Sequence, residues 1–206
     1  MNKLKIFLSA ILAGLCITFG GAVYLLCESK ILGAFLFTIG LFAICTMGFH
    51  LYTGKVCYIP DNKPSYVIDI LIIWLGNLVG TFVGAKLQLL TRYGNTLATT
   101  ASTICQTKLS DNLLSIFILA AFCNAMIYFS VDEFKTNKQE LGEYLALFFG
   151  VVVFILCGFE HCVANMYYFT LASVWSLRTL GYLLVMTLGN ALGGIAFHML
   201  HKLASK

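Results

Sequence analysis

The residues best suited to chemistry stand in one stretch, GFEHCVANM, at residues 158–166. Glu160 and His161 are adjacent, and a carboxylate beside an imidazole can exchange protons with a bound molecule or help to hold a metal ion. The sequence supplies no further enzymatic partner, because it contains no HExxH motif, no paired aspartates and no serine nucleophile with a plausible base. An enzyme with an acid–base or metal pair is therefore the weaker interpretation, and we expect neither a metal nor a cofactor.

The composition around this stretch is typical of an integral membrane protein. Of the 206 residues, 60% are hydrophobic and 11% are charged, whereas soluble domains are nearer half apolar and a quarter charged. Six apolar runs are each near the ~20 residues that cross a bilayer, which leaves almost nothing for a soluble domain. They lie at about residues 6–26, 31–52, 66–90, 112–131, 144–169 and 174–200.

The polar residues outside these runs give less information. The net charge of +4 is spread over the loops, so nucleic acid is not indicated as a partner. The eight cysteines form no CxxC pair, and we expect them to be buried and reduced. His198, His201 and Lys202, at the end of the last run, are interpreted as interfacial residues that complement a helix C-terminus. The mixed charges from Asp132 to Glu143 are interpreted as a solvated loop.

The distribution of Lys and Arg predicts the orientation, because cytoplasmic loops carry an excess of these residues. With a cytoplasmic N-terminus and six spans, both termini lie on the cytoplasmic side of the plasma membrane. That side then carries Lys3, Lys5, Lys55, Lys63, Lys135, Lys138, Lys202 and Lys206, and the other side carries Lys30, Lys86, Arg92, Lys108 and Arg178.

An internal repeat links the two halves of the chain. GFHLYTG, which begins at Gly48, corresponds to GFEHCVAN, which begins at Gly158. LGNLVG, which begins at Leu75, corresponds to LGNALG, which begins at Leu188. The first three spans are thus echoed by the last three, in repeats of about residues 1–92 and 108–206. Since three is odd, the halves must enter the membrane from opposite sides, as in many channels and transporters.

Each half contains one span that we expect to be broken, the second and the fifth. Irregular backbone at membrane depth is tolerated only where it lines a cavity or is buried in protein, so the two breaks most simply face each other across a pore. Asn77 and Asn190, each after a glycine, could hydrogen-bond the backbone that the breaks release. Glycines spaced four residues apart in the third and sixth spans could equally serve close helix packing.

At this point the residues resemble a known family. GFEHCVANM is similar to the signature of the formate/nitrite transporters, and HLYT at 50–53, WLGNLVG at 74–80 and TLGNALGG at 187–194 resemble its other landmarks, in the expected order. The resemblance covers essentially the whole chain. It implies an aquaporin-like, all-α membrane domain of six helices, two of them broken, in a homopentamer with one pore per subunit. Members pass small monovalent anions or their acids, such as formate, nitrite, hydrosulfide or lactate.

The resemblance also implies roles for individual residues. His161 matches the central pore histidine, Thr53 the loop threonine opposite it, and Asn124 an asparagine that reaches towards the histidine. Lys108 matches a vestibule lysine and Glu160 its acidic partner. Asn77, Asn190 and Asn165 are expected to give structural support. One hydrophobic constriction is implied at Phe37, Leu41 and Phe154, and another at Leu51, Tyr52 and Ile127.

The chain departs from the family pattern at several positions. His50 stands where many members have Asp or Glu, Tyr52 where Phe is usual, and Cys162 where Ser is usual. Thr170 and Val185 stand where prolines are common, and we do not expect the amphipathic helix that often precedes the first span in this family. These departures bear on gating and on substrate preference rather than on the fold.

The implied mechanism is anion entry followed by protonation. A charged anion cannot cross a dry ring of Phe and Leu, because desolvating it costs too much. Lys108 and the positive ends of the half-helices would attract the anion, whose own pKa rises as the dielectric constant falls. His161, expected to be mostly neutral, would relay a proton or donate a hydrogen bond, with Thr53 and Asn124 fixing its orientation.

Other interpretations stay open for each residue. Glu160 could be purely structural, Lys108 an ordinary loop charge, His161 a satisfied core histidine, and Phe37, Leu41 and Phe154 core packing. A neutral-solute channel of the water or glycerol type would have a similar outline. That class uses paired Asn-Pro-Ala half-helices, and this chain has no such motif. The sequence does not name the anion, nor does it separate channel-like flux from proton-coupled transport.

Overall fold

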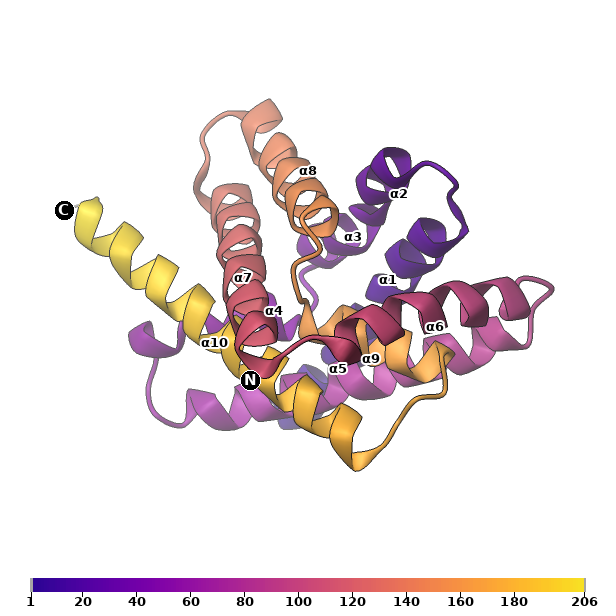
Figure 1. The fold of residues 1–206 in the computed structure, drawn as a ribbon. Helices are drawn as coiled ribbons and strands as arrows, with labels where there is room; N and C mark the ends of the chain where they lie inside the picture. The colour runs from indigo at the N-terminus through magenta and orange to yellow at the C-terminus, as the bar shows by residue number, and fades with distance from the viewer. Residues whose placement is uncertain (1, 206) are drawn as a thin grey trace.

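The computed structural model describes residues 2–205, apart from the side chain of Glu140, and every regular element in that range is a helix (Figure 1). Five helical segments of the described chain are long and apolar enough to cross a membrane. They are α1 (Lys3–Leu26), α2 with α3 (Lys30–Phe37 and Ile39–Met47), α5 (Tyr66–Leu89), α7 (Leu113–Thr136) and α10 (Leu177–Ala204). The fifth predicted span is divided between α8 (Glu140–Leu156) and α9 (Cys162–Leu171).

The remaining elements include one long helix that the sequence did not predict. They are α4 (Tyr52–Val56), the 3-10 turn η1 (Ile59–Asp61) and α6 (Gly94–Ser110). Helix α6 is rich in polar residues and lies between two apolar runs, so its composition did not predict a helix. Its buried positions Gly94, Leu97, Ala101 and Cys105 recur every three or four residues, which is the stripe of an amphipathic helix. The predicted loop after residue 131 is likewise partly helical, since α7 continues to Thr136.

Two helix pairs form the frame of the molecule, α1 with α5 and α7 with α10. Glycines allow the two helices of each pair to approach each other closely. A Cβ atom at Gly80 of α5 would overlap the carbonyl oxygen of Ile11 in α1, and one at Gly193 of α10 would overlap that of Ala121 in α7. The spaced glycines of the third and sixth predicted spans therefore let the backbones of paired helices touch.

Between the members of each pair, the chain bends at equivalent glycines. α3 ends before Gly48 (φ 71°) and α8 ends before Gly158 (φ 66°), and both lie in the left-handed region that favours glycine. Phe49 N–H donates to the Ile44 carbonyl, and Phe159 N–H donates to the Phe154 carbonyl, so both helices end with the same i to i−5 hydrogen bond. A Cβ atom would meet nothing within 4 Å at either glycine, so backbone conformation alone requires glycine there.

An asparagine holds each bend through the same three kinds of hydrogen bond. Asn77 accepts from Tyr52 N–H (2.8 Å) and donates to the carbonyls of Ala10 (2.8 Å) and His50 (3.0 Å). Asn190 accepts from Cys162 N–H (2.9 Å) and donates to the carbonyls of Ala120 (2.7 Å) and Glu160 (2.8 Å). Both amides are fully buried, where an unpaired backbone group would be costly.

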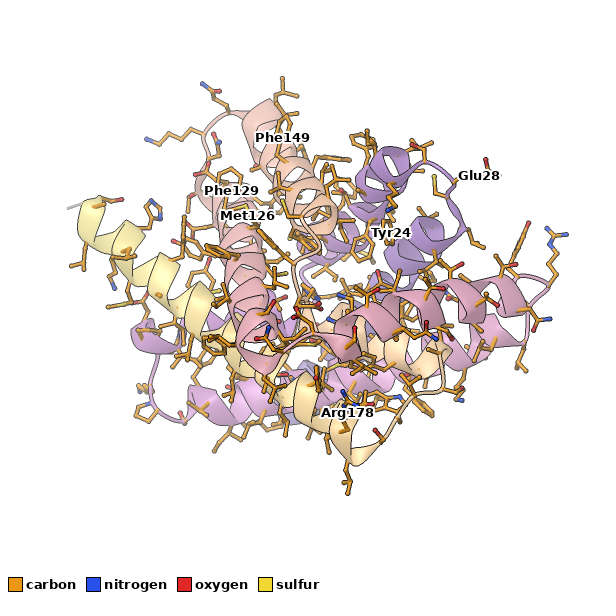
Figure 2. All side chains as sticks on the ribbon, viewed as in Figure 1. Tyr24, Glu28, Met126, Phe129, Phe149 and Arg178 are labelled. Carbon is orange, nitrogen blue, oxygen red and sulfur yellow. The ribbon has the colours of Figure 1, made fainter. Side chains whose placement is uncertain are left out.

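The outer surface and the two ends of the bundle differ in character. Apolar side chains cover the outward helix faces, as Phe149 on α8 does in Figure 2. At one end, Lys3 pairs with Asp69 and Lys202 pairs with Asp61, so the first helix begins and the last helix ends on the same side. Lys108 and Arg178 lie together at the other end, where Arg178 donates to the carbonyl of Leu109 (2.8 Å). Lys206 lies outside the described residues.

Candidate functional site

His161 occupies the bend between α8 and α9, and both of its ring nitrogens have partners. Its Nδ1 accepts from the backbone N–H of Ala164 (3.1 Å), which makes His161 the N-cap of α9. Since this nitrogen accepts, the proton of the neutral ring must reside on Nε2. Nε2 therefore donates to Thr53 Oγ1 at 2.9 Å. The structure thus joins the two bends through one hydrogen bond between buried side chains.

Glu160, the neighbour of His161, belongs to a buried charged group. Its Oε2 atom accepts from Lys108 Nζ (2.5 Å) and from Asn165 Nδ2 (2.8 Å). The Lys108 side chain is 13% exposed and that of Glu160 is 3% exposed. Lys108 comes from α6, the helix that the sequence did not predict, and reaches the α8–α9 bend from there. A pair this well buried and geometrically close is costly to break from either side.

A cavity of about 560 Å³ opens beside this group. We call it the Lys108 cavity, and it is lined among others by Lys108, Phe154, Glu160, His161, Asn165 and Tyr168. A second cavity of about 100 Å³, the Lys55 cavity, is lined among others by Leu41, Leu51, Lys55, Val131, Phe134 and Lys135. Both cavities contain lysine, and only the Lys108 cavity reaches His161.

The residues predicted to form constrictions are all buried, with exposures of 5% or less. Phe37 packs its ring edge against Phe154 at 6.0 Å between centroids, and Phe154 stacks on the His161 ring at 5.7 Å. Leu41 and Leu51 lie instead on the wall of the Lys55 cavity. The structure therefore places the two predicted leucines at the Lys55 cavity and Phe154 at the Lys108 cavity.

The remaining constriction residues and Asn124 have other surroundings. The Tyr52 hydroxyl donates to the Thr187 carbonyl (3.1 Å), and Ile127 lies in the core. The Asn124 amide donates to the Asn190 carbonyl (2.7 Å) and to Cys57 Sγ (3.4 Å), and its buried Oδ1 has no hydrogen-bond partner in the described chain. Its hydrogen bonds thus support the bends, whereas the expectation was a contact that orients His161.

Several residues around the site carry no motif and were not singled out by the sequence. Tyr24 and Tyr168 line the Lys108 cavity, and the buried Tyr168 hydroxyl has no partner in the described chain. Tyr168 lies seven residues, or two helical turns, after His161. This spacing is the signal by which the sequence could have placed Tyr168 on the same helix face as His161. His50, which stands where many family members have Asp or Glu, contacts α1: its Nδ1 lies 2.7 Å from Ser9 Oγ. No cluster suited to a metal ion occurs within residues 2–205.

Comparison with known proteins gives consistent matches along the chain. Residues 1–204 match the family described as formate/nitrite transporter. The probable formate transporter of Methanothermobacter thermautotrophicus is 28% identical over 234 residues, which cover 94% of this chain and 85% of that protein. The nitrite transporter NirC of Salmonella typhimurium is 27% identical over 222 residues, which cover 95% of this chain and 81% of that protein.

Solved structures give the same answer for the fold. A structure described as a pentameric formate channel with formate bound superposes with a TM-score of 0.83 at 25% identity, covering 98% of this chain and 97% of that one. An ion channel of the same family superposes with a TM-score of 0.85 at 24% identity, covering 100% of this chain and 91% of that one. The predicted all-α fold of a multi-pass membrane protein is confirmed.

Proposed function

Because the chain belongs to the formate/nitrite transporter family, we propose that it conducts small monovalent anions of weak acids, or the acids themselves, across a membrane. Formate and nitrite are the first candidates, since relatives are described as formate and nitrite transporters. Hydrosulfide and lactate belong to the same chemical class. The observation that carries the proposal is the hydrogen bond between His161 and Thr53, which joins the two bends beside the Lys108 cavity.

The anion enters the Lys108 cavity by electrostatic attraction. Lys108 attracts it, although Glu160 offsets most of that charge at short range. The ten-residue helix α9 adds the positive end of its dipole, because its N-terminus begins at His161. Beyond this point stand the rings of Phe154 and Phe37, where a bare charge loses its hydration. The substrate therefore takes up a proton before it passes.

His161 and Thr53 assist this step as hydrogen-bonding groups. His161 donates to Thr53 Oγ1, so the Thr53 hydroxyl keeps its own proton for donation to the passing oxyanion. Placing a second proton on His161 would displace the Ala164 N–H from Nδ1 and put a charge at the positive end of α9. His161 thus serves as a donor or a transient relay and does not store a proton.

The proposed assembly and location are supported by the same relatives and by the charges at the ends of the bundle. The pentameric formate channel superposes over nearly the whole chain, so we propose a homopentamer with one pore in each subunit. Its subunits lie in the plasma membrane with both termini in the cytoplasm. The shared side of the Lys3–Asp69 and Lys202–Asp61 pairs supports the common location of the termini, and the excess of lysine there supports the cytoplasmic assignment.

The test uses purified protein in liposomes that contain a pH-sensitive dye. Formate, nitrite, hydrosulfide and lactate are supplied in turn, with glycerol as a neutral solute. We expect flux of at least one anion together with a change in internal pH, and little glycerol flux. Replacing His161 with Phe should abolish the pH change. Glycerol flux without anion flux would favour the neutral-solute alternative, and unchanged proton uptake in the variant would exclude the relay.

A further inference from the structure

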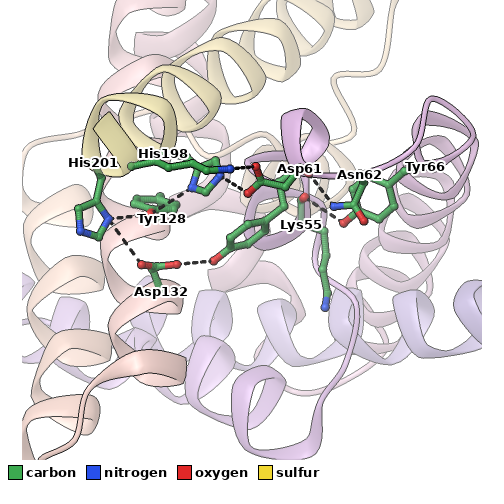
Figure 3. Close-up of polar contacts among 10 residues, drawn as sticks. Lys55, Asp61, Asn62, Tyr66, Tyr128, Asp132, His198 and His201 are labelled. Carbon is green, nitrogen blue, oxygen red and sulfur yellow. Dashed lines mark hydrogen bonds and ion pairs between the residues drawn. The ribbon is translucent and has the colours of Figure 1, made fainter. Parts of the chain in front are cut away.

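Almost all buried polar side chains of the described chain have hydrogen-bond partners within it. His198 of α10 is a clear example (Figure 3). It is 6% exposed, so it is a core residue, and the interfacial role predicted from the sequence is wrong for it. Its Nε2 lies 2.6 Å from Asp61 Oδ2, and its Nδ1 lies 3.2 Å from the Tyr128 hydroxyl. A side chain whose polar atoms are paired in this way gives no sign of a ligand.

Four buried side-chain atoms are exceptions, because they have no hydrogen-bond partner within residues 2–205. They are Thr38 Oγ1, Asn124 Oδ1, Asn165 Oδ1 and the Tyr168 hydroxyl oxygen. Asn165 and Tyr168 line the Lys108 cavity, whereas Thr38 and Asn124 line neither of the two cavities. An unpartnered buried polar group is costly, so two of them at one cavity indicate a ligand that supplies both hydrogen bonds.

Asn165 and Tyr168 share one face of α9 with His161. Asn165 follows the N-cap residue His161 by four positions and Tyr168 follows it by seven, so the three lie along the same side of the helix. All three line the Lys108 cavity, and so does Phe154, whose ring stacks on that of His161 at 5.7 Å. Under the proposed function, the two residues therefore lie where the substrate is protonated before it passes Phe154.

The chemical roles of the two unpartnered atoms follow from their neighbours. Asn165 Nδ2 lies 2.8 Å from Glu160 Oε2 and 3.0 Å from the carbonyl oxygen of His161. A carbonyl can only accept, so the amide nitrogen must face it, and the remaining amide atom, Oδ1, is an acceptor that lacks a donor. The Tyr168 hydroxyl has a proton that lacks an acceptor. Together the two side chains offer a ligand one donor and one acceptor.

One donor and one acceptor match a protonated acid better than they match its anion. Formic acid has an O–H group that donates and a doubly bonded oxygen that accepts, and nitrous acid has the same two groups. An anion only accepts, so it would leave Asn165 Oδ1 without a donor. Hydrogen sulfide can donate, but sulfur is a weak acceptor, so it would leave the Tyr168 hydroxyl poorly paired.

We infer that Tyr168 and Asn165 form a specificity site for protonated oxyacids: the Tyr168 hydroxyl donates to the doubly bonded oxygen of the acid, and Asn165 Oδ1 accepts from its O–H group. The ligand class is acids that carry both groups on one atom, which includes formic, nitrous and lactic acid and excludes hydrogen sulfide. Both protein atoms are covered by their neighbours, so a small movement of the cavity wall admits the acid. The role of this site in conduction rests on the proposed function, whereas binding of the acid does not.

The first arm of the test measures how flux into liposomes depends on the concentration of formate and, separately, of hydrosulfide, at one fixed pH. Tyr168→Phe removes the hydroxyl and keeps the ring. Because one hydrogen bond to the acid is lost, we expect about fivefold higher KM for formate and an unchanged KM for hydrosulfide. Tyr93→Phe removes an exposed hydroxyl outside the cavity lining and should match the wild type. Equal changes for the two substrates, or no change for either, would overturn the site.

The second arm measures binding without transport, as the Tm of the purified protein in sodium formate and in sodium chloride at about pH 4, where a carboxylic acid is partly protonated. We expect formate to raise the Tm of the wild type more than that of Tyr168→Phe. In chloride the variant should melt at or slightly above the wild-type temperature, because its hydroxyl gives up no protein partner.

Two results of this arm would contradict the inference. Equal formate effects on both proteins would exclude binding through the hydroxyl. A lower Tm of the variant in chloride would mean that the hydroxyl already has a partner, which would remove the reason for the site. In contrast, a larger formate effect on the wild type without flux of any anion would overturn the proposed function and leave the site standing.

Discussion

At the scale of single residues, the orientation of His161 is decided by one backbone group and one hydroxyl. Ala164 N–H occupies Nδ1 and Thr53 Oγ1 occupies Nε2, so the ring has one neutral tautomer that satisfies both contacts. The motif GFEHCVANM identifies the histidine in the sequence, because ionisable residues within an apolar membrane segment are costly and usually functional. The Asn124 contacts could not be predicted, because they depend on how α7 and α10 lie against α4.

Removing the hydroxyl of Thr53 should therefore lower conduction without unfolding the protein. Thr53→Val keeps the shape of the side chain and leaves His161 Nε2–H without its acceptor. A lost hydrogen bond of about 1 kcal/mol predicts roughly fivefold lower anion flux in liposomes. Thr53→Ser keeps the hydroxyl and should retain most of the flux. Wild-type flux in the Val variant would show that the contact does not serve conduction.

Asp61 gives a prediction for acid stability, because Lys202 and, second, His198 hold the pKa of its carboxyl below the usual range. A lowered folded-state pKa stabilises the protein above the unfolded pKa of about 3.9, and this contribution is lost as the pH falls through the folded value. Asp61→Asn should therefore lower the Tm at pH 6, and its difference from the wild type should shrink steadily in melts below about pH 4. The side chain is 31% exposed, so a small shift is expected. A difference that grew in acid would contradict this assignment.

At the scale of elements, the positions of the bends follow from the sequence, and their neighbours do not. Gly-Phe before polar residues indicates both bends, and α3 and α8 end one or two residues before those glycines. The spacing does not show that the second span also divides at Thr38, where α2 gives way to α3. Helix α6 was missed for a different reason: its Thr and Ser residues resemble a loop by composition, although it supplies Lys108.

The bend at Gly158 offers a test of backbone conformation alone. Gly158→Ala adds a Cβ atom that meets no neighbour, so its cost comes only from the left-handed φ of 66°. We expect a loss of about 1 kcal/mol or slightly more in the free energy of unfolding in detergent. Gly181→Ala also enters open space, but within α10, where alanine is favoured, and should be neutral or stabilising. If both changes had the same effect on the free energy of unfolding, the left-handed backbone at Gly158 would impose no cost on alanine.

At the scale of the whole molecule, two matching frames hold two matching bends. The pairs α1–α5 and α7–α10 each place an asparagine against the bend of their own half, and the two sets of contacts correspond atom for atom. The repeated LGN motif predicts this correspondence. It does not predict the contact between His198 and Asp61 in the loop after α4, because that contact is not part of the repeat.

The matching frames lead to a prediction about folding of the whole chain. Gly80→Val and Gly193→Val each force a branched side chain into the backbone of the partner helix, at Ile11 and Ala121 respectively. Since neither backbone can yield without separating a helix pair, both variants should lose most of the monodisperse protein seen by size-exclusion chromatography. Leu192→Val, on the exposed face beside Gly193, should behave like the wild type. If only one glycine variant failed, the two frames would differ in how much of the fold depends on them. Comparable losses would instead mean that each half needs its own closely packed pair before the bends, and hence His161 and Thr53, can meet.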